Sequence, residues 1–316
     1  MKNSKLIVFL LALFLISICA CGPKEKAGSP GVEEMLKMFP VEAKGVFFVD
    51  VDKGMITEMV RDIIIEEAQK MGKFSEKTGI DLEKDVHYLA AAFIPVSPKN
   101  YEGVAIINLE YDKEKILSLI QEKSQAELAT EDYERITLYF SDKQKTECVV
   151  MLDAFHIAVG NAVGAKSCID VLQGRKDNVF KNESLSALFR RTDKSTIVWA
   201  AIVDPAQTLN MPTSQSPQLK IAESFNSLTM NLDYKNKSVL VDIKAEGEDV
   251  EKNHQLAQTL NGFKALGATM ISDKPELGEL LNAVQISSGD DHVRISANIP
   301  EELAHKLKKI IKITPE

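Results

Sequence analysis

The side chains best suited to metal or acid–base chemistry in this sequence include its five histidines. They are His87, His156, His254, His292 and His305. None belongs to an HExxH or HxH pair, whereas a zinc site needs three or four converging ligands. We therefore expect ordinary core or surface histidines and no metal site.

Aspartates at the ends of expected strands offer a second kind of chemistry, because paired carboxylates can act as acid and base. Asp50 and Asp52 leave one strand on the same face, and Asp204 follows another. Helix capping explains Asp52 and Asp204 equally well. The cluster Asp290-Asp291-His292 falls in an expected hairpin turn, where Asp is common for backbone reasons. Without a GxSxG elbow, P-loop or GxGxxG segment, we expect no enzyme, no catalytic residue and no cofactor.

The N-terminus, residues 1–20, has the order of a secretory signal peptide. Lys2 and Lys5 precede an apolar run over Leu6–Ile16, and small residues then lead to Cys21. The run is too short to cross a bilayer core, which needs about 20 apolar residues. We expect an exported protein.

The segment Ile18-Cys19-Ala20-Cys21 resembles the lipobox of bacterial lipoproteins, although Cys19 departs from the usual Ser, Ala or Thr. The resemblance implies that Cys21 becomes the first residue and carries diacylglycerol and an N-linked acyl chain such as palmitate. Two or more acyl chains make a stable membrane anchor. Because Gly22 follows, the resemblance also implies the outer membrane, facing the periplasm. The alternative is an ordinary signal peptide cut nearby, with Cys21 as a bystander.

After Cys21, residues 21–31 are expected to form a flexible tether, since Gly, Pro, Lys, Glu and Ser offer almost nothing to bury. Two α+β halves should follow, over 32–193 and 194–316. The formal charge of −8 argues against nucleic acid, whose binding depends on Lys and Arg. No second apolar run reaches spanning length, so the body is expected to be soluble and held at the membrane by Cys21 alone.

Two interpretations of Cys148 and Cys168 stay open. An exported protein meets an oxidising compartment, so a disulfide between them is one interpretation. The other, which we favour, is a pair of buried thiols that act as small hydrophobic groups. Neither cysteine forms a CxxC pair, so redox and zinc chemistry are not expected.

Apolar periodicity and turn residues predict the elements that must position these side chains. The expected strands are 45–51, 88–94, 104–109, 135–141, 146–152, 155–159, 196–203, 227–234, 238–245, 284–287 and 292–297. The expected helices are 53–71, with Asp52 as N-cap, one that starts after Asp112, and 164–173, 185–189, 249–266, 276–281 and 301–311. Helices interleaved with hairpins predict the α+β class, with an antiparallel sheet in each half and helices packed on one of its faces.

The two halves of the sequence also share a pattern. The strand around Ile157 and the helix around Ile169 match those around Ile295 and Leu307, in both cases 138 residues later (295 − 157 = 138). Earlier strands do not keep this offset. We infer an internal duplication with insertions; the alternative is a chance echo between strand–helix units.

Several stretches carry a resemblance to a known group of proteins: GVFFVDVDKGM, TGIDLEKDVHYLAAAF and VRISANIPEELAHKLKKI, together with the lipobox. They resemble a group of exported bacterial lipoproteins of uncharacterised function, built from duplicated α+β units. The resemblance covers most of the mature chain and implies fold and location. It implies no catalytic residue.

Three functions are compatible with these patterns. The first is a non-catalytic envelope lipoprotein that binds a partner protein or ligand at the periplasmic face of the membrane. The second is a carrier of a lipid or another apolar ligand, held in a cavity between the two sheets and lined by Phe, Ile and Met. The third is a hydrolase, which a cleft with convergent Ser or Asp and His would mark.

Overall fold

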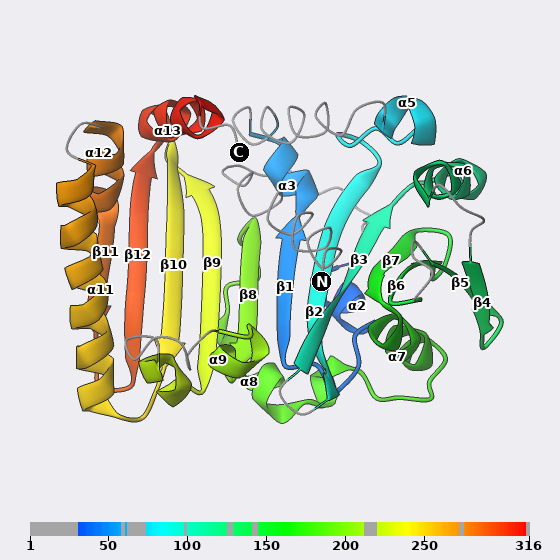
Figure 1. Ribbon diagram of the computed structural model, residues 1–316, viewed down its shortest axis with the longest axis horizontal. Coiled ribbons are helices and arrows are strands. Elements are labelled where there is room, and N and C mark those ends of the chain that lie inside the picture. Colours follow the sequence, from blue (N-terminus) through cyan, green and yellow to red (C-terminus); the bar gives the residue numbers. More distant parts are fainter. Residues whose placement is uncertain are drawn as a thin grey trace.

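The computed structural model describes residues 31–57, 61, 74–97, 100–124, 129–140, 145–211, 220–271 and 275–313. These residues form an α+β body around a twelve-stranded sheet (Figure 1). The strand order is β11-β12-β10-β9-β8-β1-β2-β3-β7-β6-β5-β4. The expected signal peptide, Cys21 and residues 21–30 of the tether lie outside the described residues.

The first half of the chain supplies β1 to β7 and the helices between them. Its strands are β1 (Gly45–Asp50), β2 (Val86–Ser97), β3 (Asn100–Leu109), β4 (Ala129–Tyr133), β5 (Ile136–Phe140), β6 (Glu147–Met151) and β7 (His156–Asn161). Its helices are α2 (Val32–Leu36), α3 (Val51–Met55), α5 (Phe74–Thr78), α6 (Lys113–Ser124), α7 (Ala162–Leu172), the 3₁₀ turn η1 (Val179–Lys181) and α8 (Glu183–Arg191).

The second half supplies β8 to β12. Its strands are β8 (Val198–Val203), β9 (Ser227–Lys235), β10 (Ser238–Glu246), β11 (Val284–Ser288) and β12 (His292–Pro300). Its helices are α9 (Pro205–Thr208), the 3₁₀ turn η2 (Ile221–Ser224), α11 (Val250–Met270), α12 (Pro275–Ala283) and α13 (Glu301–Ile313).

The halves meet where β1 pairs with β8, Gly45 opposite Ile202 and Val49 opposite Val198. The antiparallel α+β class is confirmed, because each strand pairing in the described part of the chain is antiparallel. The expectation of one sheet in each half is wrong, because the β1–β8 pairing makes a continuous sheet. Sequence periodicity could not reveal this pairing, since it joins segments about 150 residues apart.

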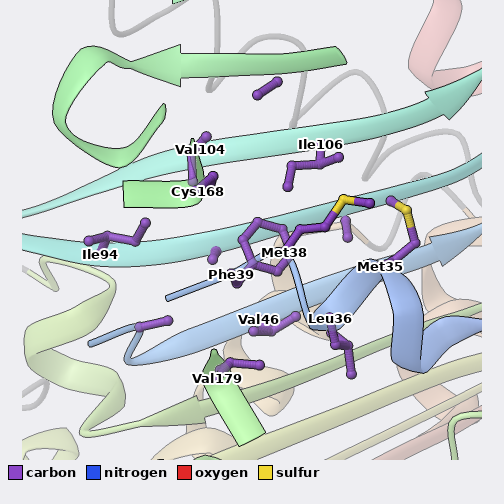
Figure 2. Packing of buried hydrophobic residues seen from close by; sticks show 14 of the residues in the cluster. Met35, Leu36, Met38, Phe39, Val46, Ile94, Val104, Ile106, Cys168 and Val179 are labelled. Atoms are coloured by element: carbon purple, nitrogen blue, oxygen red, sulfur yellow. The ribbon is translucent and has the colours of Figure 1, made fainter. Parts of the chain in front are cut away.

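Both faces of the sheet are buried near its centre. Alternation along β1 sends Val46 and Phe48 to one face, and Phe47 and Val49 to the other. On the first face, α2, α7 and α8 pack over the strands, and Figure 2 shows Met35 and Cys168 within this cluster. On the second face, the packed side chains include Ile116 of α6. The prediction that helices pack on only one face of the sheet is therefore wrong for the first half.

Trp199 lies at the centre of the first cluster with no exposed surface. Its ring stacks on Phe48 at 5.4 Å between centroids and meets Phe189 of α8 edge-on at 5.8 Å. The indole Nε1 has no hydrogen-bond partner among the described residues. The aromatic contacts tie β1, β8 and α8 together, and so tie the halves together.

The faces of the sheet differ at β9, β10 and β12. One face carries mostly polar side chains, such as Asn231 and Asp242. The other is apolar but only half-buried at Met230, Ile243 and Ile295. At one end of these strands, α11 covers the apolar face, and its Ala257 packs with Phe225 and Val293.

Outward from the centre, the two sides of the sheet follow the same order. The first half runs β1, β2, β3, β7, β6, and the second runs β8, β9, β10, β12, β11. In both, a helix follows the third strand, α6 or α11, and another follows the last strand, α7 or α13. The first half adds the hairpin β4–β5 beyond β6. The helices α7 and α13 differ in placement, since α7 packs in the first cluster whereas Ala304 of α13 packs against the second.

Several predicted elements are confirmed, with shifted ends. The hairpin of 227–234 and 238–245 is β9–β10, and its turn residues Asn236 and Lys237 have φ of 53° and 58°, as a two-residue turn requires. The helix predicted over 249–266 is α11, capped by Asp249 and extending to Met270. Of the helix predicted over 53–71, the structure describes only the start, α3, and isolated Arg61; the remainder lies outside the described residues.

Candidate functional site

A polar depression of about 540 Å³ lies where the two halves meet. The ends of β8 and β10, the start of β9, the helix α8 and the turn before β12 surround it. Its charged lining residues are Lys44, Arg191, Asp204, Glu246, Glu248 and Asp291. Two of the residues singled out in the sequence, Asp204 and Asp291, therefore lie in this depression, which we call the seam depression.

Glu246, at the end of β10, organises the charges of the seam depression. Arg191 Nη1 lies 2.9 and 2.8 Å from its two carboxylate oxygens, and Ser227 Oγ donates to it at 2.8 Å. Lys244 Nζ donates to it at 3.1 Å. Burial raises the pKa of Glu246, but the hydrogen bonds from Ser227 and Lys244 and the charge of Arg191 outweigh it, so that the net pKa is below its usual range.

Asp204 and Lys44 add charges that no described residue neutralises. Asp204 precedes α9, as the sequence predicted, with Pro205 as the first helical residue. Its side chain makes no capping hydrogen bond, and its backbone is left-handed, with φ of 48°. Neither its carboxylate nor the Lys44 ammonium forms an ion pair with a described residue. The seam depression thus offers both signs of charge to a polar partner.

The two other aspartates from strand ends lie at the far end of β1. Asp50, not Asp52, is the N-cap of α3, and its carboxylate accepts from the Lys53 N–H at 3.0 Å. Asp52 lies inside α3 and contacts His87 Nδ1 at 3.1 Å. The expected capping role of Asp52 is therefore wrong, because β1 ends at Asp50 and α3 already begins at Val51. Asp50 and Asp204 are about 20 Å apart along the strands and form no pair.

A buried polar group lies between β3 and β7, and of its members the sequence singled out only His156. His156 is 7% exposed, and its Nδ1 lies 2.8 Å from both oxygens of Asp153. Its Nε2 lies 3.0 Å from Asn108 Nδ2. The Asn108 Oδ1 has no hydrogen-bond partner among the described residues. The DxxH spacing was the available signal, but Asn108 reaches the group only through the β3–β7 pairing.

These groups do not form the cleft that would mark a hydrolase. Asp153 and His156 converge, but the third side chain of this polar group is the Asn108 amide, which is not a nucleophile. None of the three lines the seam depression. Asp291 contacts His292 at 2.5 Å in the hairpin turn, and this hydrogen bond lowers the pKa of Asp291. Within the described ranges, no cluster of three His, Cys, Asp or Glu residues could hold a metal ion.

Cys148 and Cys168 lie in the first core cluster as thiols, both buried. Burial raises the pKa of the Cys168 thiol far above its usual range, and the neighbouring Cys148 raises it further. A disulfide between them stays a prediction. Cys21 and its N-terminal neighbours in the lipobox lie outside the described residues.

Another depression, of about 620 Å³, lies between η2 and the start of α11. It is lined mainly by polar and charged residues, among them Lys220, Glu223 and Gln255. Neither depression has the Phe, Ile and Met lining expected of an apolar-ligand carrier. A cavity between two sheets is not available either, because β1 and β8 belong to one sheet. No helix among the described residues is long and apolar enough to cross a membrane.

Comparison with known proteins gives distant similarities. No protein-family model matches the sequence. The chain is 24% identical to the uncharacterized protein MJ0635 of Methanocaldococcus jannaschii over 204 residues, 63% of this chain and 68% of that protein. Crystal form III of TP0453 superposes with a TM-score of 0.49 and 15% identity, covering 90% of this chain and 100% of that one. Crystal form I of TP0453 gives a TM-score of 0.46 and 15% identity, covering 90% and 99%.

Proposed function

We propose that this chain is a lipid-anchored envelope protein whose folded body binds a partner protein and catalyses no reaction. The observation that carries the proposal is the order of Lys2 and Lys5, the apolar run Leu6–Ile16 and the segment Ile18–Cys21. Lipid on Cys21 would place the body at the outer membrane, facing the periplasm. The polar seam depression supports binding of a polar surface, because it presents unpaired charges beside an organised ion-pair network.

Fatty-acid labelling tests the anchor. Cells that express the full chain are fed an alkyne-modified palmitate, and the purified protein and the membrane fraction are examined. We expect label and membrane association in the natural chain and in Cys19→Ala, and the loss of both in Cys21→Ala, because only Cys21 follows the small residue at the cleavage site. Label that persists in Cys21→Ala would exclude the lipobox interpretation.

The proposal includes an internal duplication, with 32–193 and 194–316 as its two units. The shared strand order outward from β1 and β8 supports it, as does the position of a helix after the third strand in each half. The hairpin β4–β5 is then an insertion in the first unit. Expression of the two units as separate chains tests whether each folds; we expect neither to fold alone, because Trp199 packs between them.

A second candidate function, apolar-ligand binding, rests on the half-buried face of β9, β10 and β12. Beside it, α11 exposes Phe263 and Met270, at 52% and 83%. Native mass spectrometry of the body, residues 22–316, tests this candidate. A reproducible added mass that organic solvent releases would favour a ligand on this face, and a clean unliganded mass would leave the partner-protein function.

A further inference from the structure

The two outermost strands of the sheet, β11 and β4, differ in what lies beside them (Figure 1). At one end α11 lies beside β11; at the other, β4 forms the margin, with no described element beyond it. An outermost strand presents unpaired N–H and C=O groups, to which a further strand can add. A partner strand can therefore pair only where the outward N–H and C=O groups of the outermost strand lack hydrogen-bond partners.

At the β11 end, the outward carbonyl groups are occupied. The Gly289 N–H donates to the His292 carbonyl at 2.8 Å, so the alternation of the ladder turns the backbone groups of Val284 and Ile286 away from β12. Lys264 Nζ donates to the Val284 carbonyl at 2.5 Å, and Asn261 Nδ2 donates to the Ile286 carbonyl at 3.4 Å. Side chains of α11 thus close this edge.

At the β4 end, the outward groups are largely unoccupied. Glu134 and Arg135, with φ of 51° and 68°, form a two-residue turn, so Tyr133 and Ile136 are a hydrogen-bonded pair. Because hydrogen-bonded and non-hydrogen-bonded pairs alternate along the ladder, Asp132 and Thr130, one and three residues before Tyr133, point their backbone groups away from β5. Lys145 Nζ reaches the Thr130 carbonyl at 3.4 Å, and no described residue bonds the backbone of Asp132.

The β4 edge is also held in place. The Tyr133 hydroxyl donates to Asp170 of α7 at 3.0 Å. The Tyr133 ring has Lys166 Nζ at 5.3 Å and the Arg175 guanidinium carbon at 5.7 Å from its centroid. These contacts fix β4 to a helix that is itself buried in the first cluster. A rigid edge pairs with less loss of conformational entropy than a loose one.

We propose that β4 receives an added strand from a partner protein, and that this strand carries Lys or Arg opposite Asp132. This inference rests on the partner-binding function proposed above and adds the β4 edge to the seam depression as a second contact surface. Main-chain hydrogen bonds to Thr130 and Asp132 supply the pairing, and side chains on alternate positions supply selectivity.

Charge selects the occupant. The Asp132 carboxylate is exposed and accepts from Thr137 Oγ1 at 2.8 Å, but no described cation neutralises it. Its neighbour Glu131 already has Lys166 Nζ at 2.5 Å. The chain as a whole carries −8. A second copy of β4 paired antiparallel would set Glu131 opposite Glu131 in one register or Asp132 opposite Asp132 in another, and like charges across a strand pair are destabilising.

Photo-crosslinking with defined peptides tests the proposal. The photoreactive residue p-benzoylphenylalanine replaces Thr130 on β4 or, as the matched control, Gln285 on β11, in the purified full chain in detergent. The probe is a biotinylated Lys-Val-Lys-Val-Lys-Val peptide; one comparison peptide has methylated backbone nitrogens, and another has Glu in place of Lys. We expect about a tenfold higher yield at 130 with the Lys peptide than with the methylated one, since methylation removes the pairing hydrogen bonds. At 285 the two peptides should give equal, low yields.

Charge reversal provides the second arm. In the chain with p-benzoylphenylalanine at position 130, Asp132→Lys should switch the preference from the Lys peptide to the Glu peptide. Glu251→Lys on α11 should leave the preference unchanged. Equal yields at both edges, indifference to backbone methylation, or crosslinked dimers of the chain in place of peptide adducts would each overturn the proposal. The assay does not depend on the lipid at Cys21, so its failure and the failure of the anchor are separate results.

Discussion

The two halves of the sheet are built in the same order but buried differently. Around β1, β2 and β3, both faces are covered, and side chains such as Phe48 and Ile106 have no exposed surface. Around β9, β10 and β12, one face is polar and the other is apolar but only half-buried. We infer that most of the stability lies in the first half and the centre, whereas the second half and the β4 margin provide surfaces for contact.

The largest expected effect is at the centre of the sheet. Trp199→Ala should cost about 3–5 kcal/mol of unfolding free energy, because it leaves a cavity between β1, β8 and α8. Met230→Ala, on the half-buried face, should cost about 1 kcal/mol, since its side chain loses less contact. Urea denaturation measures both values. Equal costs would contradict the difference between the halves.

A smaller effect is expected where α11 is attached to the second half. Asn253 is 1% exposed, and its Nδ2 donates to the carbonyl groups of Gly247 and Asp290, both at 2.9 Å. Asn253→Ala should cost about 1–3 kcal/mol, because it leaves the buried Gly247 carbonyl and the partly buried Asp290 carbonyl without this donor. The exposed Gln258→Ala on the same helix is the control and should be neutral. Thermal unfolding of the two variants would separate them.

The pH dependence of stability tests the centre of the seam depression. Because the net pKa of Glu246 is lower in the folded chain, the unfolded chain takes up a proton first as the pH falls. The stabilisation by Glu246 is therefore complete above its unfolded pKa of about 4.3 and is lost as the pH falls through the lower folded value.

Glu246→Gln should remove this part of the acid destabilisation, measured as unfolding free energy between neutral and acidic pH. The exposed Glu251→Gln serves as the control. If the natural chain and Glu246→Gln lose stability in parallel as the pH falls, the ion-pair network contributes nothing at this site.

The smallest effect concerns the attachment of β4. Tyr133→Phe removes the hydrogen bond to Asp170 and keeps the ring beside Lys166 and Arg175. We expect a loss of about 0.5–1.5 kcal/mol, the net value of one hydrogen bond. Hydrogen exchange should quicken at the amides of β4 and β5 and stay unchanged at β11. Uniform acceleration across the sheet would argue against a local role for this contact.

Local sequence pattern predicted many of the strands and turns, including β11 at one margin of the sheet, but not β4 at the other. The hairpins β9–β10 and β11–β12 follow from alternation and turn residues, and both are present. The strand β4 was missed, because Ala129–Tyr133 is polar and has no apolar alternation. Its strand conformation depends on pairing with β5 across the Glu134-Arg135 turn, not on its own residues.

In the candidate site too, the sequence identified individual residues, but only the tertiary structure showed which of them lie together. Asp204 and Asp291 were singled out from strand ends and turns, yet only the β8, β10 and β12 packing brings them to one depression with Glu246. The Asp153–His156–Asn108 group needs a contact between residues 48 apart in sequence. Such contacts depend on register, which sequence periodicity leaves open.

By itself, the sequence determined the α+β class and the helices and strands of strong periodicity; export and lipid on Cys21 are predictions from its N-terminal residues. These depend on interactions among residues close in the chain or on short patterns. The tertiary structure decided that β1 and β8 make one sheet of the two halves, that helices cover both faces in the first half, and that β11 is closed while β4 is open. These features depend on pairing between distant segments, where the burial of complementary faces, not local preference, selects the partner.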